Sequence, residues 1–106
     1  MSNVKKDALK AASDLKTNAK VAATMLKAIA NESRLLILCI LEGTELSVTE
    51  LNVHLALSQS ALSQHLAVLR KNGLVTTRRE SQTIYYSLSD GRSSTVIKTL
   101  HDLYCA

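Results

Sequence analysis

Residues 47–88 constrain the fold of this chain most strongly, because they predict two helices joined by a short turn and followed by a β-hairpin. Ser47, with Glu50 three residues later, forms a capping box that predicts a short helix over 48–55. A three-residue turn then leads to Ser58, a favourable N-cap for a second helix. This succession predicts a helix-turn-helix unit.

The second helix of this pair is predicted to end before Gly73 and to have two unlike faces. One face is apolar and is expected to meet the core through Leu62, Leu66 and Leu69. The other carries small amide and hydroxyl groups, and no acidic residue occurs from position 51 to 79. Small polar side chains on a helix can reach base edges, and neighbouring basic groups can hold phosphates. The sequence therefore favours a DNA-binding surface here.

Two short strands are predicted after this helix, over 74–79 and 83–88, because both segments are rich in Val, Thr, Ile and Tyr. Residues 80–82 form the predicted tip of the hairpin. Gly91 then separates the hairpin from a last helix, predicted over 93–104. The apolar residues of that helix that we expect to face inward are Val96, Leu100 and Leu103.

The longest predicted helix covers 5–29 and carries a narrow apolar stripe. Its members recur at alternating steps of four and three residues: Ala8, Ala12, Leu15, Ala19, Ala22, Leu26 and Ile29. This spacing is typical of coiled coils. The stripe is longer than the core of one small domain can cover, so we expect it to form a dimer; packing over its own domain is the alternative.

Asn31 is a favourable N-cap for the next helix, which is predicted to run to about Glu42 and to stop at Gly43. Its central segment, residues 35–41, is apolar on every side. Such a helix is expected to be buried all round. Cys39 lies in this segment and is therefore expected within the core or at its edge.

The composition fits a single, mainly α domain over residues 1–106. The chain is 46% hydrophobic, has three aromatic residues, all Tyr, and contains no proline. A core of Leu, Ile, Val and Ala suits helices better than a β-sandwich. The net charge of +4 is uneven and favours a nucleic-acid partner. No apolar run has the length of a membrane span or the pattern of a signal peptide, so we expect a cytoplasmic protein without a membrane partner.

The side chains predicted to contact DNA lie at the start of the second helix of the pair and in the basic cluster. In a helix-turn-helix the N-terminal residues of that helix face the bases, and here they are Gln59, Ser60, Ser63 and Gln64. A polar solvent-exposed face is the alternative. The basic cluster comprises Arg70, Lys71, Arg78 and Arg79, and because the last two alternate along a strand we expect one of them to reach DNA directly. His65 either faces a phosphate or fills the seam between helix and strands.

With these elements in place, the chain resembles the ArsR/SmtB family of bacterial winged-helix repressors over almost its whole length. The matching segments are 26–35, 57–66 and 70–75. The resemblance implies a mainly α fold with a small β-hairpin, in the order of three helices, a recognition helix, two strands and a last helix. It also implies a homodimer joined through the first and last helices, bound to a partly palindromic double-stranded DNA operator.

The chain departs from the family at its usual metal sites. Ser47 and Thr49 stand where many members carry a Cys-Val-Cys segment, and hydroxyls are poor ligands for ions that thiolates hold. Near and along the last helix only Asp90, His101 and Asp102 remain as candidate ligands. We therefore predict no metal site of either usual kind and no cofactor.

The two cysteines, Cys39 and Cys105, resemble the pair in the HlyU- and BigR-like subgroup of the family. That resemblance implies a sensor of reactive sulfur or oxidants, in which the two sulfurs link directly or through added sulfur atoms and DNA binding falls. Protonated His101, one turn before Cys105, could favour its thiolate at the unfavourable end of a helix. A purely structural role for Cys39 as a small core residue is the alternative.

Three rival functions remain at this point. One is a metal-responsive repressor of the same fold that uses Cys39, Cys105 and His101 as a non-standard site. A redox enzyme or sulfur carrier lacks support, because the chain has no Cys-x-x-Cys, no cofactor loop and no acid/base constellation, and we predict no catalytic residue. The third is an interaction protein that uses a winged helix without reading DNA.

Overall fold

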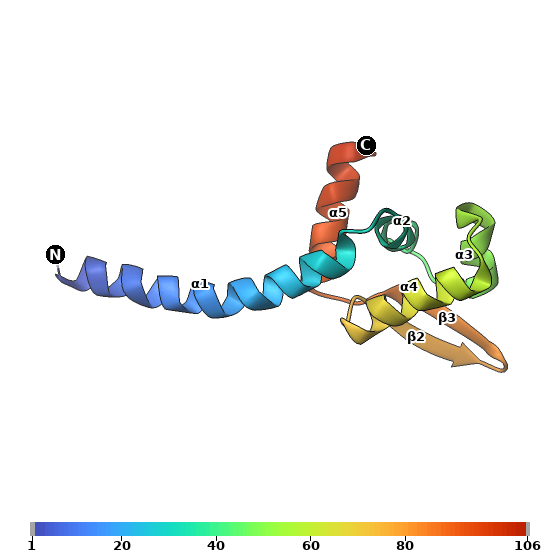
Figure 1. Ribbon diagram of the computed structural model, residues 1–106, viewed down its shortest axis with the longest axis horizontal. Coiled ribbons are helices and arrows are strands. Elements are labelled where there is room, and N and C mark those ends of the chain that lie inside the picture. Colours follow the sequence, from blue (N-terminus) through green and yellow to red (C-terminus); the bar gives the residue numbers. More distant parts are fainter. Residues whose placement is uncertain (1, 106) are drawn as a thin grey trace.

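The computed structural model describes residues 2–105, which form five helices and a small three-stranded sheet (Figure 1). The elements in chain order are α1 (Ser2–Ile29), α2 (Glu32–Ile40), β1 (Leu46–Ser47), α3 (Val48–Leu55), α4 (Gln59–Lys71), β2 (Val75–Glu80), β3 (Thr83–Leu88) and α5 (Arg92–Tyr104). The predicted mainly α fold with a β-hairpin is confirmed. The short strand β1 was not predicted.

The core lies where α2, α3, α4 and α5 meet above the hairpin. Its fully buried side chains are aliphatic and come from each of these helices, from the residue after α2 and from the residue before β2: Ile37, Leu38, Leu41, Leu51, Leu62, Leu66, Leu69, Leu74 and Ile97. The three leucines predicted to form the inner face of α4 are all among them. Burying a side chain of this size contributes about 1.5–3 kcal/mol, so this cluster fixes how α4 sits on the domain.

The three predicted helix N-caps are present. Asn31 accepts a hydrogen bond from the backbone N–H of Arg34, and Ser58 accepts one from Ala61. In the capping box, the Ser47 N–H donates to Glu50 Oε1 at 3.0 Å and the Glu50 N–H donates to Ser47 Oγ at 3.2 Å. These local bonds start α2, α3 and α4 at the predicted residues.

The turn between α3 and α4 is held by a side chain that the sequence did not single out. Asn52 Nδ2 donates to the carbonyl of Leu57 at 2.8 Å, and the N–H of Leu57 donates to Asn52 Oδ1 at 3.0 Å. Between them Ala56 takes a left-handed conformation with φ 54°. The two bonds compensate for the strain of this conformation and fix the angle between the two helices.

The sheet has the strand order β1-β3-β2, with both pairs antiparallel. Glu80 pairs with Thr83, so the hairpin turn contains two residues rather than the predicted 80–82. On the other edge of β3, Leu46 pairs with Tyr86 and Ser47 with Tyr85. The residue that caps α3 is therefore also part of the sheet, which ties the helix-turn-helix to the hairpin.

Two expectations about burial were wrong. The helix α2, which ends at Ile40 instead of about Glu42, is not buried all round, because Leu36 is 48% exposed. In α5 the fully buried residue is Ile97, whereas Leu103, predicted to face inward, is 70% exposed. The reason is that α5 meets the core only near its start, and its last turns rise away from the sheet beside α2 (Figure 1).

The helix α1 extends away from the rest of the molecule (Figure 1). The one stripe residue of α1 that is buried in the core is Ile29, next to buried Ala28, while Leu15 is 67% exposed. The radius of gyration is accordingly 17.3 Å, against about 13 Å for a compact chain of this length. None of the helices described over residues 2–105 is long and apolar enough to cross a membrane.

Candidate nucleic-acid interface and thiol pair

The polar face of α4 lies on the surface of the molecule. Since its three buried leucines fix the inner face, the four side chains predicted to read bases are left exposed: Gln59, Ser60, Ser63 and Gln64. His65 is half-buried, a position compatible with both roles considered for it. Arg70 and Lys71 are exposed in the last turn of α4, and both border a hollow that Ser63 and Tyr86 also line.

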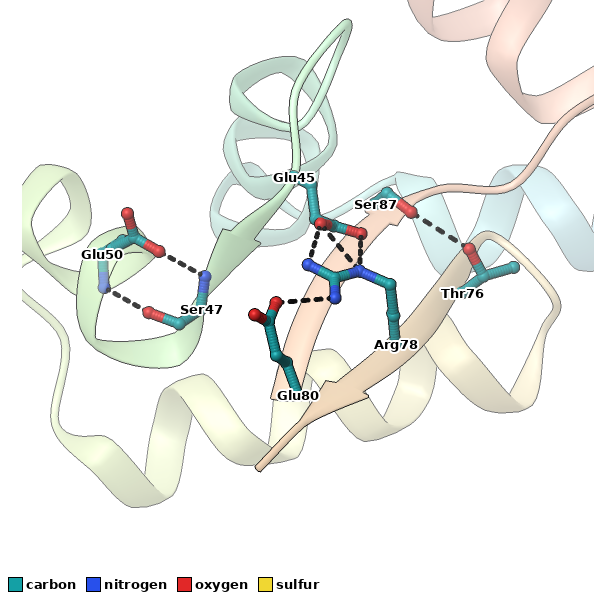
Figure 2. A network of polar contacts seen from close by, with 7 residues as sticks. All are labelled: Glu45, Ser47, Glu50, Thr76, Arg78, Glu80 and Ser87. Carbon is teal, nitrogen blue, oxygen red and sulfur yellow. Dashed lines mark hydrogen bonds and ion pairs between the residues drawn. The ribbon is translucent and has the colours of Figure 1, made fainter. Parts of the chain in front are cut away.

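Arg78 and Arg79, neighbours on β2, have different surroundings. Arg78 Nη2 lies 2.7 Å from Glu45 Oε1, and Arg78 Nη1 lies 2.8 Å from Glu80 Oε2 (Figure 2). The guanidinium also lies 4.8 Å from the centre of the Tyr85 ring. Arg79 is exposed and makes no ion pair within the described part of the chain.

The hydrogen bonds of this network shift both partners in the expected directions. Hydrogen bonds to Glu45 and then Glu80 raise the pKa of Arg78, and the bond from Arg78 lowers the pKa of the Glu45 carboxyl. The Arg78 guanidinium is thus already paired with two carboxylates of its own chain. The network joins β2 to the segment that follows α2, a contact between residues far apart in the sequence.

The two cysteines come together at one cavity between α2 and the end of α5. Both thiols are free, and both line a cavity of about 250 Å³. The remaining wall is mostly apolar and consists of Glu32, Leu35, Leu36, Leu100 and Tyr104. Cys39 is half-buried and Cys105 is exposed, so the Cys39 side chain is less accessible to solvent than that of Cys105.

Burial raises the pKa of the Cys39 thiol, and the neighbouring Cys105 and Glu42 raise it further. The Cys39 thiol is therefore a weaker source of thiolate than an ordinary cysteine. A thiolate is the form that attacks sulfur. Of the two thiols, exposed Cys105 is therefore the better placed to react first.

His101 points toward the carboxylates beside the cavity. Its Nδ1 lies 3.8 Å from Glu42 Oε2 and 3.9 Å from Asp102 Oδ1. That oxygen of Glu42 is buried and has no hydrogen-bond partner within residues 2–105. When protonated, His101 is close enough to balance the negative charge of Glu42. His101 is not among the residues that line the cavity.

No group of three or more His, Cys, Asp or Glu side chains in the described chain is arranged to hold a metal ion. The hydroxyl of Ser47, which stands where a thiolate ligand occurs in many members of the family, is occupied in capping α3. Cys39, Cys105 and His101, the metal ligands of the rival interpretation, do not form such a group in residues 2–105.

The core helices, the helix-turn-helix of α3 and α4 and the β2–β3 hairpin define a winged helix-turn-helix protein. The arsR family of bacterial regulatory proteins matches residues 31–77. A solved structure of reduced HlyU from Vibrio cholerae is 55% identical, and the aligned region covers 88% of this chain and 98% of that one, with a TM-score of 0.85. The chain therefore belongs to the arsR family.

A second solved structure, the transcriptional repressor BigR from Xylella fastidiosa, is 34% identical over 88% of this chain and 92% of that one, with a TM-score of 0.81. Among curated proteins, the transcriptional activator HlyU of Vibrio cholerae is 53% identical over 56 residues, which are 53% of this chain. The match spans about half of that protein, 52% of its length. These relatives include both an activator and a repressor.

Proposed function

We propose that this transcriptional regulator of the arsR family binds DNA as a homodimer and loses DNA affinity when Cys39 and Cys105 become linked. The observation that carries the proposal is that both thiols line one cavity between α2 and α5. A direct link forms one S–S bond, and two electrons and two protons pass to the oxidant, which cleaves its own O–O or S–S bond. With a sulfur donor, added sulfur atoms can remain in the bridge.

The change in DNA affinity would follow from the elements that carry the two sulfurs. Cys39 lies on α2, which packs on α3, α4 and α5, and Cys105 directly follows α5. A bond between them fixes α5 against α2. If α5 belongs to the dimer interface, that bond alters the spacing of the two α4 helices and mismatches them to successive major grooves of a partly palindromic operator.

A second copy of the chain is the partner we propose for the exposed stripe of α1, together with Leu103 and Tyr104 of α5. Replacing Leu15 with Glu would put a carboxylate into that apolar contact, at a cost of several kcal/mol. We expect the dissociation constant of the dimer to rise at least about a hundredfold, measured by size-exclusion chromatography with light scattering. Thr17→Glu, which adds the same charge outside the stripe, should leave the dimer intact. Equal effects of the two changes would contradict this role of the stripe.

The different surroundings of Arg78 and Arg79, the two arginines of the β2–β3 hairpin (the wing), lead to a second prediction. In Arg79→Ala we expect DNA affinity to fall by a similar factor on all sequences, and the slope of log affinity against log salt to become shallower by about one, since one phosphate contact is lost. Arg78→Ala should change the slope less, because Glu45 and Glu80 already match that charge. Fluorescence anisotropy at several KCl concentrations measures both. If Arg78→Ala changed the slope as much as Arg79→Ala, Arg78 would also be a phosphate contact.

A further inference from the structure

We propose that Glu32 makes the thiol cavity selective for uncharged sulfur donors over anionic ones. The biological use of this selectivity rests on the proposed thiol switch, but its physical basis does not. Glu32 lies in the first turn of α2, is exposed, and lines the same cavity as the two cysteines. It contributes the one carboxylate among the described side chains that line the cavity.

An anion entering this cavity meets two unfavourable effects. It loses hydration against a wall of leucine and tyrosine side chains, and it approaches the negative charge of Glu32. The Glu32 carboxylate also offsets the partial positive charge at the N-terminus of α2, which would otherwise attract an anion. An uncharged donor of similar size meets neither effect and gains from apolar contact.

The donor class that fits is an uncharged organic disulfide or polysulfide. The thiolate of Cys105 attacks one sulfur of R–S–S–R, forming a Cys105–S–S–R bond and releasing RS⁻, which takes up a proton. Cys39 then loses its proton and attacks Cys105 Sγ, releasing a second RS⁻. The two cysteine thiols are oxidised by two electrons, and the donor is reduced to two RSH.

The charge selectivity can be tested without DNA and without a redox reaction. Iodoacetamide and iodoacetate are alkylating agents of similar size that differ by one negative charge, and both react with a thiolate to form an S–C bond and iodide. Their rate constants at Cys39 and Cys105 would be measured on the reduced full chain by peptide mass mapping. The reference is an uncharged small-molecule thiol. We expect the ratio of iodoacetamide to iodoacetate rates to be about two to five times higher in the protein than in the reference at low salt, and to fall as salt is raised.

Glu32→Gln should lower that ratio about two- to threefold by raising the iodoacetate rate, while the iodoacetamide rate stays nearly unchanged. Asp90→Asn, which removes one negative charge at the opposite end of α5, serves as the matched control and should leave the ratio as in the wild type. The salt dependence of the wild-type ratio provides a test that needs no variant. A wild-type ratio equal to that of the reference thiol, or equal changes in both rates in Glu32→Gln, would overturn the proposal.

This outcome is independent of the thiol switch. If charge selectivity is found but linkage of the cysteines leaves DNA affinity unchanged, Glu32 controls access to the thiols and the switch is wrong. If the switch operates but Glu32→Gln leaves the ratio of the iodoacetamide and iodoacetate rates unchanged, the switch stands and the role of Glu32 is wrong.

Discussion

Replacing either Cys39 or Cys105 with Ser is expected to abolish the loss of DNA affinity that a sulfur donor causes in the wild type. Reduced wild type and both variants should bind DNA within about twofold of each other, because neither thiol lies on the exposed face of α4. After treatment with an organic polysulfide, affinity of the wild type should fall about 5- to 150-fold, the usual range of coupling between two sites. Each variant should change by less than about twofold, because a single cysteine cannot close the bridge.

The measurement is fluorescence anisotropy at one fixed salt concentration, on a duplex selected from a random library by the reduced protein. Intact-mass analysis of the same samples shows whether the bridge is direct or contains added sulfur, and parallel treatment with peroxide separates the two oxidants. The Cys39→Ser, Cys105→Ser double variant controls for damage to other residues. Release of DNA by treated Cys39→Ser at the wild-type level would show that no link between the two cysteines is needed.

Replacing Gln64 with Ala is expected to remove sequence-specific binding while leaving non-specific binding nearly intact. A bidentate contact of an amide with adenine is worth about 1–3 kcal/mol of discrimination, which corresponds to roughly 5- to 150-fold in affinity for the selected duplex. The side chain is exposed on α4, so its loss should not disturb the core. Binding to a duplex of scrambled sequence is the internal control.

This pattern differs from the one expected for Arg79→Ala, which should weaken both duplexes by a similar factor. If Gln64→Ala weakened specific and scrambled duplexes equally, Gln64 would not read a base. Unchanged affinity for both would favour the interpretation of this face as ordinary polar surface. Thermal unfolding of the variant distinguishes a lost contact from a lost fold.

The sequence predicted those parts of the fold that depend on local rules. Asn31, Ser47 with Glu50, and Ser58 each cap a helix through a bond spanning three residues, so the residue types and their spacing were sufficient. The apolar face of α4 was predicted for the same reason. The side chains of that face could be assigned from helical periodicity alone.

The features that were missed depend on contacts between distant segments. The strand β1 has two residues and exists because β3 pairs with it, and no local pattern marks so short a strand. The carboxylates that hold Arg78 include Glu45, which lies far from it in sequence. The burial of Ile97 instead of Leu103 depends on where α5 leaves the core. The cysteines were recognised from a resemblance, whereas the cavity that joins them is visible only in three dimensions.

The short strand β1 also bears on how the protein behaves when it is concentrated. Because β1 pairs with Tyr85 and Tyr86 of β3, the hairpin edge that has no neighbouring strand along its whole length within residues 2–105 is that of β2. An uncovered strand edge invites pairing with the edge of another molecule, and charged side chains are the usual protection against it. The outer half of β2 carries Arg78, Arg79 and Glu80 in succession. The charges of the wing therefore also protect the sheet against edge-to-edge aggregation.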